Sequence, residues 1–133
     1  MSQDKRKIEL VSFYVEKANN SLADAKLLAE NNRWNGCANR LYYACFFMVY
    51  AILLDKIDVR IKSHSGIKTL FNQHFIKTGI IEMVHSKHYT YLFDLRGDAD
   101  YGDFEIITKE EIAPLVVGTE MFINNLKEFI SKA

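Results

Sequence analysis

The sequence predicts an all-α fold, namely an up-and-down four-helix bundle with an additional short helix, in a single domain of residues 1–133. Fourteen consecutive residues, 41–54, contain neither a charge nor a helix breaker. Six glycines and one proline are few, and strand-like alternation is hard to find. Since 49% of the residues are hydrophobic and 26% are charged, the composition is that of an ordinary folded domain.

Residues 41–54 should form the central helix. They are apolar on every side, so every face of this helix needs to be covered. A helix of that length is roughly 21 Å long, shorter than the roughly 30 Å of bilayer hydrocarbon, which favours a core helix over a membrane span. We expect the helix to begin near Trp34 and to end near Asp55. Its surplus of aromatic surface predicts that one face is covered by a second subunit.

The preceding helix is predicted over residues 4–31, because its apolar residues alternate spacings of three and four, as in a helical bundle. Asn31 and Asn32 are expected to end it. The apolar positions are Ile8, Val11, Val15, Ala18, Leu22, Ala25 and Ala29.

Three further helices are expected after the central one. Ser63 is a plausible N-cap for a short helix over residues 64–77. Another is predicted over residues 81–96, with Arg96 in its last turn and Gly97 just beyond it. Residues 98–107 are expected to form a loop.

The last helix should begin at a capping box formed by Thr108 and Glu111. Pro114 conflicts with that start, because proline lacks the backbone N–H and clashes with the preceding turn. Either this helix kinks at the proline or it starts nearer Ala113.

The charge balance, the two cysteines and the first ten residues limit the classes of function. The 17 basic and 17 acidic residues cancel, so there is no overall field of the kind that drives general nucleic-acid binding. Cys37 and Cys45 lie eight residues apart on one helix, too far for a disulfide, and are expected to be buried thiols. The first ten residues lack the apolar run of a signal peptide, so we expect a cytoplasmic protein with no membrane association.

Arg40 is the first candidate for function, because it is the only charge between Arg33 and Asp55. An arginine beside a covered helix needs a carboxylate or a phosphate, and Asp98 and Asp100 are candidate partners. One interpretation is a buried ion pair between Arg40 and an aspartate. The other is a site in which Arg40 and Arg96 bind a phosphate while Tyr42, Tyr43 or Tyr101 stacks on a base. The two interpretations can coexist.

The four histidines, His64, His74, His85 and His88, fall within 25 residues. His85 and His88 can share a helix face, but no second pair of ligands stands at fixed spacing, so we expect no metal site. His64 and His74 are expected to have capping or surface roles, and His88 to be partly buried. Residues 56–87 are mainly basic and residues 94–111 mainly acidic. If RNA binds, it is expected on the basic segment.

Three segments of the chain together resemble the HEPN family, named for nucleotide binding in higher eukaryotes and prokaryotes. The segments are Arg40-x-x-Tyr43-Ala44-x-Phe46, His64-Ser65-Gly66 and Leu95-Arg96-x-x-Ala99-Asp100-Tyr101. The similarity covers nearly the whole chain and is closest to the small stand-alone prokaryotic branch. It implies a four-helix bundle with a short extra helix, commonly dimeric. It also implies a partner, since members are often encoded beside minimal nucleotidyltransferases in pairs that behave as toxin and antitoxin.

Many members of this family are metal-independent ribonucleases in which an arginine is followed, after four to six residues, by a histidine. Here four residues separate Arg96 from Tyr101, and no histidine follows Arg96. A phenol with a pKa near ~10 is a poorer general base at neutral pH than an imidazole near ~6.5. The loop at residues 98–101 matches the branch that lacks nuclease character.

The sequence therefore predicts a non-catalytic or weakly catalytic HEPN module that dimerises and binds a nucleotide, a minimal nucleotidyltransferase or both, without a cofactor. The alternatives are a metal-independent endoribonuclease that uses Arg96 with Tyr101 or with a histidine from elsewhere in the fold, and a purely structural scaffold. A narrower hypothesis has Tyr101 accept a nucleotidyl group from the partner. The predicted ligand-binding residues are Arg40, Tyr43, Arg96, Asp98, Asp100 and Tyr101.

Overall fold

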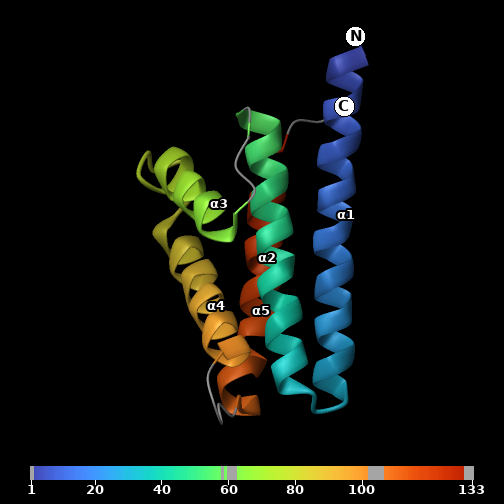
Figure 1. Cartoon of the computed structure of the whole chain (residues 1–133), viewed down its shortest axis with the longest axis vertical. Coiled ribbons are helices and arrows are strands. Elements are labelled where there is room, and N and C mark those ends of the chain that lie inside the picture. Colours follow the sequence, from blue (N-terminus) through green and yellow to red (C-terminus); the bar gives the residue numbers. More distant parts are fainter. Residues whose placement is uncertain (1, 58, 60–62, 102–106, 131–133) are drawn as a thin grey trace.

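The protein is an all-helical bundle (Figure 1). The structure, a computed structural model, describes residues 2–57, 59, 63–101 and 107–130, with side chains described for residues 5–57, 59, 63–96 and 107–130. The predicted fold class is confirmed. The elements in order are α1 (Ser2–Glu30), α2 (Trp34–Lys56), α3 (His64–Phe71), the π-helix η1 (Asn72–Ile76), α4 (Met83–Tyr101) and α5 (Lys109–Lys127).

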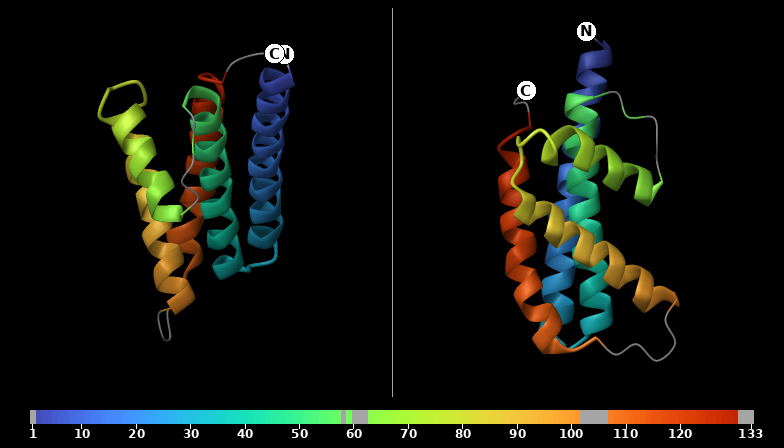
Figure 2. Two further views of the ribbon diagram at one scale, coloured as in Figure 1. Left: turned by 45° about the horizontal axis from the view of Figure 1, so that its top comes forward. Right: turned by 90° about the vertical axis from the view of Figure 1, so that its left-hand side faces the viewer.

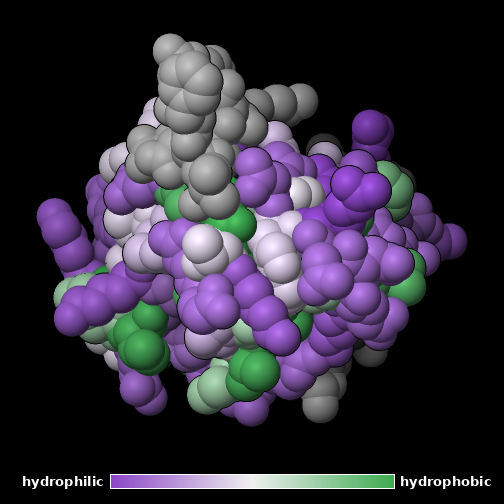
Figure 3. Space-filling model, turned by 90° about the horizontal axis from the view of Figure 1, so that it is seen from below, coloured by the Kyte–Doolittle hydropathy of each residue, from purple (hydrophilic) through white to green (hydrophobic). Residues whose placement is uncertain are grey.

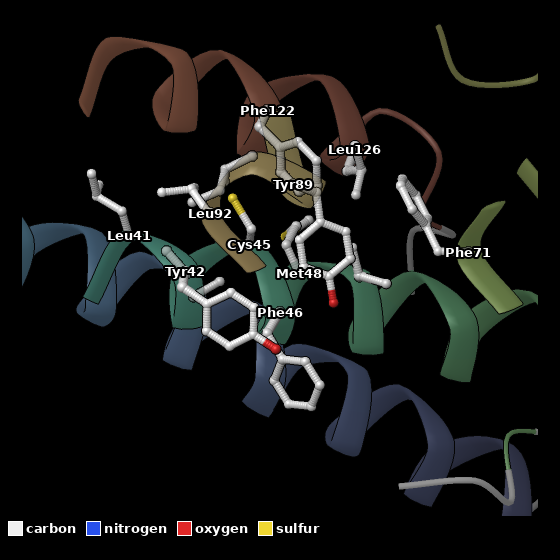
Figure 4. Close-up of a cluster of buried hydrophobic side chains, with 14 of the residues drawn as sticks. Leu41, Tyr42, Cys45, Phe46, Met48, Phe71, Tyr89, Leu92, Phe122 and Leu126 are labelled. Atoms are coloured by element: carbon white, nitrogen blue, oxygen red, sulfur yellow. The ribbon is translucent and has the colours of Figure 1, made fainter. Parts of the chain in front are cut away.

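The predicted central helix is α2, which packs against α1, α3, α4 and α5. Twelve of its 23 residues are buried. The expectation that every face is covered holds only in part, because the side that carries Tyr43, Phe47 and Tyr50 is half-buried. Figure 4 shows Leu41, Tyr42, Cys45 and Met48 of α2 meeting Tyr89 and Leu92 of α4 and Phe122 of α5. Both cysteines are buried thiols, as expected.

Among the described helices, α2 alone is long and apolar enough to cross a bilayer, yet 67% of its apolar window is buried inside the protein. Packing in the bundle therefore accounts for its composition. The end of the molecule seen in Figure 3 is mainly hydrophilic, with hydrophobic side chains in separate small groups. Scattered groups of this kind are ordinary on a folded protein.

The connection between α1 and α2 is a tight turn of three residues. Asn32 adopts a left-handed conformation, with φ of 58°, which asparagine tolerates better than most residues. The Asn31 side chain donates to the carbonyl of Leu27 at 2.9 Å. The expected stop at these two asparagines is confirmed, and it places α1 antiparallel to α2.

The segment after α2 forms a short arm that crosses the bundle. Ser63 caps α3 as expected, because its hydroxyl accepts the N–H of Gly66 at 3.1 Å. The helix changes to π geometry at Asn72, so the predicted helix over residues 64–77 is two elements. Figure 2 shows α3 and α4 running obliquely across α2 and α5. Because of this crossing, the N-terminus of α3 contacts α2.

The predicted end of α4 at Arg96 is wrong. The helix continues through Gly97 to Tyr101, so Asp98 and Asp100 are part of a helix and not of a loop. A glycine inside a helix costs only about 1 kcal/mol and does not by itself end it. The rest of the expected loop, residues 102–106, lies outside the described residues.

The helix α5 starts at the predicted cap and not near Ala113, with the Thr108 hydroxyl accepting the N–H of Glu111 at 3.3 Å. Pro114 lies inside α5. A proline there leaves the carbonyl of Glu110 without its helical donor. Because Glu110 and Pro114 are both exposed, water can bind that carbonyl.

Candidate functional site

Arg40 lies half-buried in the second turn of α2. Its Nε and Nη2 both donate to Oδ1 of Asn39, at 3.1 and 2.8 Å. Its guanidinium carbon is 5.0 Å from the ring centroid of Tyr43, three residues along the same helix. The amide oxygen and the aromatic face therefore hold the planar guanidinium in one orientation.

Arg96 comes to the same tyrosine from α4. Its guanidinium carbon is 5.9 Å from the Tyr43 ring centroid and 5.2 Å from that of Tyr42. Two arginines that are 56 positions apart in the sequence thus share one half-buried aromatic ring. The structure brings together Arg40, Tyr43 and Arg96, three of the predicted site residues, and we call them the arginine site.

The other three predicted residues, Asp98, Asp100 and Tyr101, have their backbone in α4. Their side chains lie outside the part of the chain whose side chains are described. The ion pair expected between Arg40 and an aspartate therefore stays a prediction. Within the described part, the hydrogen-bond acceptor of Arg40 is the amide of Asn39.

His64 belongs to this region, although it was expected to have a capping or surface role. The cap is Ser63, and the half-buried His64 ring makes a 2.6 Å hydrogen bond between its Nδ1 and the Tyr42 hydroxyl. The direction of this bond is set by which ring nitrogen carries the proton. The only sequence signal for His64 was its place in the His64-Ser65-Gly66 segment, because nothing local predicts that α3 crosses α2.

Burial and charge keep both partners of this bond neutral at pH 7. Burial lowers the pKa of His64, and the Arg96 cation lowers it further. Burial likewise raises the pKa of Tyr42, against a smaller opposing effect of Arg96. A neutral imidazole beside an arginine can accept or transfer a proton.

Tyr42 cannot stack on a base, contrary to one of the expectations. Its side chain is fully buried and lies among the rings of Tyr43, Phe46, Tyr89 and Phe93. Figure 4 shows the rings of Tyr42 and Phe46 side by side in the core. Tyr43 is half-buried and remains the tyrosine of α2 that can meet a ligand at this site.

Two lysines continue the pattern of a cation above a ring on either side of the arginine site. The Nζ of Lys68, on α3, is 5.1 Å from the Phe93 ring centroid, and Phe93 in turn contacts Tyr42. The Nζ of Lys17, on α1, is 5.3 Å from the centroid of Phe13 and 5.0 Å from that of Phe47. The positive charge therefore extends beyond the predicted residues, onto α1 and α3.

The histidines of α4 form a separate contact with α5. His88 is half-buried, as expected, and its Nε2 lies 2.9 Å from the hydroxyl of the buried Thr119. Burial, with a smaller contribution from His85, lowers the pKa of His88 from 6.5 to about 4. In the described part of the chain, no group of three or more His, Cys, Asp or Glu residues could hold a metal ion.

Comparison with known proteins identifies the family of the chain. Residues 11–129 match the family described as HEPN domain. The chain is 33% identical over 124 residues to "UPF0332 protein" of Thermotoga maritima, covering 93% of both chains. It is 32% identical to "Putative toxin MJ0605" of Methanocaldococcus jannaschii, covering 93% of this chain and 91% of the relative. It is 31% identical to "Putative toxin MJ0142" of the same organism, covering 95% and 83%. The chain therefore belongs to the HEPN domain family.

Proposed function

We propose that this HEPN domain is a toxin-like module that binds a nucleotide at the arginine site. The observation that carries the proposal is that Arg40 and Arg96 lie on the same Tyr43 ring, 5.0 and 5.9 Å from its centroid. The names of two relatives, "Putative toxin MJ0605" and "Putative toxin MJ0142", support the toxin-like character.

The chemistry of the three side chains fits a nucleotide. A guanidinium has five N–H donors, and in the described part of the chain Arg40 uses its Nε and Nη2. Its remaining donors suit phosphate oxygens, which arginine binds in bidentate fashion. A dianionic phosphate between two guanidinium groups also relieves their mutual repulsion. The partly exposed Tyr43 ring can stack on a base.

Isothermal titration with ATP, GTP and a short RNA tests the proposal. Losing a charge-assisted hydrogen bond costs about 1.5–3 kcal/mol, so Arg40→Ala and Arg96→Ala should each weaken binding about 10- to 100-fold. Arg6→Ala is the matched control, because Arg6 is exposed on α1 away from the site. Absence of binding by the wild type, or equal binding by all the folded variants, would refute the nucleotide site.

A second candidate function is metal-independent cleavage of RNA, and the position of His64 specifically favours it. His64 has a lowered pKa and bonds to the Tyr42 hydroxyl, while the Arg96 guanidinium lies over the Tyr42 ring. A neutral imidazole and a guanidinium are therefore available together. The imidazole would move a proton while Arg96 stabilises the charge that develops on phosphate. His64 would then supply the function of the histidine that is missing after Arg96.

Cleavage of a fluorescent RNA in the presence of EDTA tests this second function. The wild type should cleave it, His64→Gln and Arg96→Ala should abolish cleavage, and His74→Gln on η1 should leave it unchanged. If the wild type cleaves no RNA, or if the His64 variant cleaves as well as the wild type, the nuclease function is excluded.

We also propose a homodimer and a minimal nucleotidyltransferase partner. Apolar side chains exposed on α4 and α5, among them Val84, Val117 and Met121, support a protein interface, since they are 59–62% exposed. Light scattering at micromolar concentration, alone and with the nucleotidyltransferase, measures both associations. If Tyr101 accepts a nucleotidyl group, intact mass after incubation with that enzyme and ATP will show the adduct in the wild type and not in Tyr101→Phe.

A further inference from the structure

His64 lies against the same two tyrosine rings as the arginines. Its imidazole meets the Tyr43 ring edge-on, at 5.7 Å between centroids, and is nearly parallel to the Tyr42 ring at 5.6 Å. Arg96 lies over both of these rings, and Arg40 lies over that of Tyr43. His64 is therefore a neighbour of the arginine site, although it comes from α3 and the arginines come from α2 and α4.

The imidazole of His64 is fixed by the rings around it and by one hydrogen bond. The buried Phe46 ring stacks on it at 4.4 Å between centroids, with 12° between the planes. The Tyr42 hydroxyl, which Figure 4 shows next to the Phe46 ring, is 2.6 Å from Nδ1 of His64. Since His64 itself is half-buried, Nε2 is the ring nitrogen that remains for a ligand.

The burial of Tyr42 decides the direction of this hydrogen bond. Its side chain is fully buried, so the phenol proton cannot be bound by water. A buried hydroxyl proton needs an acceptor, and Nδ1 of His64 is the atom within reach in the described part of the chain. Tyr42 therefore donates to Nδ1, which leaves the proton of the neutral imidazole on Nε2.

We infer that Tyr42 is a positioning residue, which holds His64 as the tautomer with its proton on Nε2, so that this N–H donates to the phosphate of the nucleotide at the arginine site. The inference rests on the proposed function and deepens it. A neutral donor beside two guanidinium groups adds a hydrogen bond to the anion without adding a third positive charge. The tautomer also distinguishes the two candidate functions, since a protonated Nε2 can donate to phosphate but cannot act as a base.

Nitrogen NMR of the protein with isotope-labelled histidines tests the tautomer at pH 7. In the wild type, Nδ1 of His64 should give the signal of an unprotonated ring nitrogen and Nε2 that of a protonated one. Addition of AMP should shift the Nε2 signal more than the Nδ1 signal. In Tyr42→Phe the two signals should move toward each other, because the imidazole then exchanges between its tautomers.

Titration with AMP and with adenosine tests the contact to phosphate. His64→Leu should weaken AMP binding at least about tenfold, as expected for the loss of one hydrogen bond to a charged group, and should leave adenosine binding unchanged. Tyr42→Phe should weaken AMP binding several-fold, because His64 is still present but no longer fixed.

Tyr89→Phe is the matched control for Tyr42→Phe. It removes the hydroxyl of a second phenol that is only 1% exposed, whose ring centroid is 6.1 Å from that of Tyr42. In the described part of the chain this hydroxyl is not bonded to His64. The control should leave the AMP affinity and the nitrogen signals of His64 unchanged.

The outcomes separate this inference from the proposed function. If Nδ1 carries the proton in the wild type, Nε2 is a base, and the inference is wrong in favour of the second candidate function. If Tyr42→Phe changes neither the signals nor the AMP affinity, or if Tyr89→Phe changes them as much, Tyr42 does not position His64. If AMP binds equally to the wild type and to His64→Leu, the nucleotide site stands and the inference is refuted. If AMP does not bind, the proposed function fails together with the phosphate contact, while the signals of the free protein still decide the tautomer.

Discussion

Replacing Gly118 by alanine should destabilise the protein, although alanine is the better helix former. Gly118 lies in α5 directly against His88 of α4. A Cβ at position 118 would be 2.8 Å from Cε1 and 3.0 Å from Nδ1 of His88. These separations are too short for non-bonded atoms, so the imidazole has to move. The movement breaks its 2.9 Å hydrogen bond to the hydroxyl of the fully buried Thr119.

The expected magnitude follows from three contributions. Removing glycine from a helix gains about 1 kcal/mol. Overpacking costs about 1–3 kcal/mol, and leaving the buried Thr119 hydroxyl unsatisfied costs about 1–3 kcal/mol. The net loss is about 3 kcal/mol, the middle of the range that these contributions give. With a urea m-value of about 2 kcal/mol/M, the unfolding midpoint should fall by about 1.5 M.

Urea unfolding at pH 7, followed by circular dichroism at 222 nm, measures this shift. Gly36→Ala is the control, because its nearest contact is Leu28 Cδ1 at 3.3 Å, the end of a flexible side chain, and it should be neutral or slightly stabilising. In a His88→Ala background the clash is absent, so Gly118→Ala should raise stability by up to about 1 kcal/mol. A Gly118→Ala protein as stable as the wild type, or one equally destabilised with and without His88, would refute the reasoning.

Three further predictions concern pH, the thiols and the cap of α5. The pKa of His88 is about 4 in the folded state and near 6.5 in the unfolded chain, so the unfolded chain binds the extra proton and stability is lost as pH falls from about 6.5 to about 4. The loss of stability should be roughly 2 kcal/mol, allowing for partial exposure of His88. Urea titrations at pH 7 and pH 4.5 should show a smaller loss in His88→Gln. Equal losses in the two proteins would show that His88 does not cause the pH dependence. Burial raises the pKa of both thiols, that of Cys37 to about 11. A thiol reagent at pH 8 should therefore modify neither Cys37 nor Cys45 until urea is added. Rapid labelling of the native protein would show that the thiols are accessible. Thr108→Ala should cost about 1 kcal/mol in the same urea assay, whereas Thr108→Ser should cost little; equal effects would mean that the hydroxyl does not cap α5.

Several features of the fold could be predicted because their causes are local. The run in α2 carries no charge on any side, which predicted the centre of the bundle, and most of its residues are buried there. Ser63 and Thr108 cap the helices that follow them, because a cap involves only residues within one turn. The same local reasoning failed at Gly97, where the helix continues to Tyr101, since a glycine allows a helix to end but does not require it.

Within the candidate site, the sequence by itself predicted Arg40, Tyr43 and Arg96. Arg40 is the lone charge beside the apolar run, Tyr43 follows one turn later on the same helix, and Arg96 lies in another segment that resembles the family. It did not determine that Arg96 reaches Tyr43, that Tyr42 is fully buried or that His64 bonds to it. Only the tertiary structure decided these, because they depend on how α3 and α4 cross α2. Such a crossing is set by the packing of many side chains from helices that are distant in the sequence.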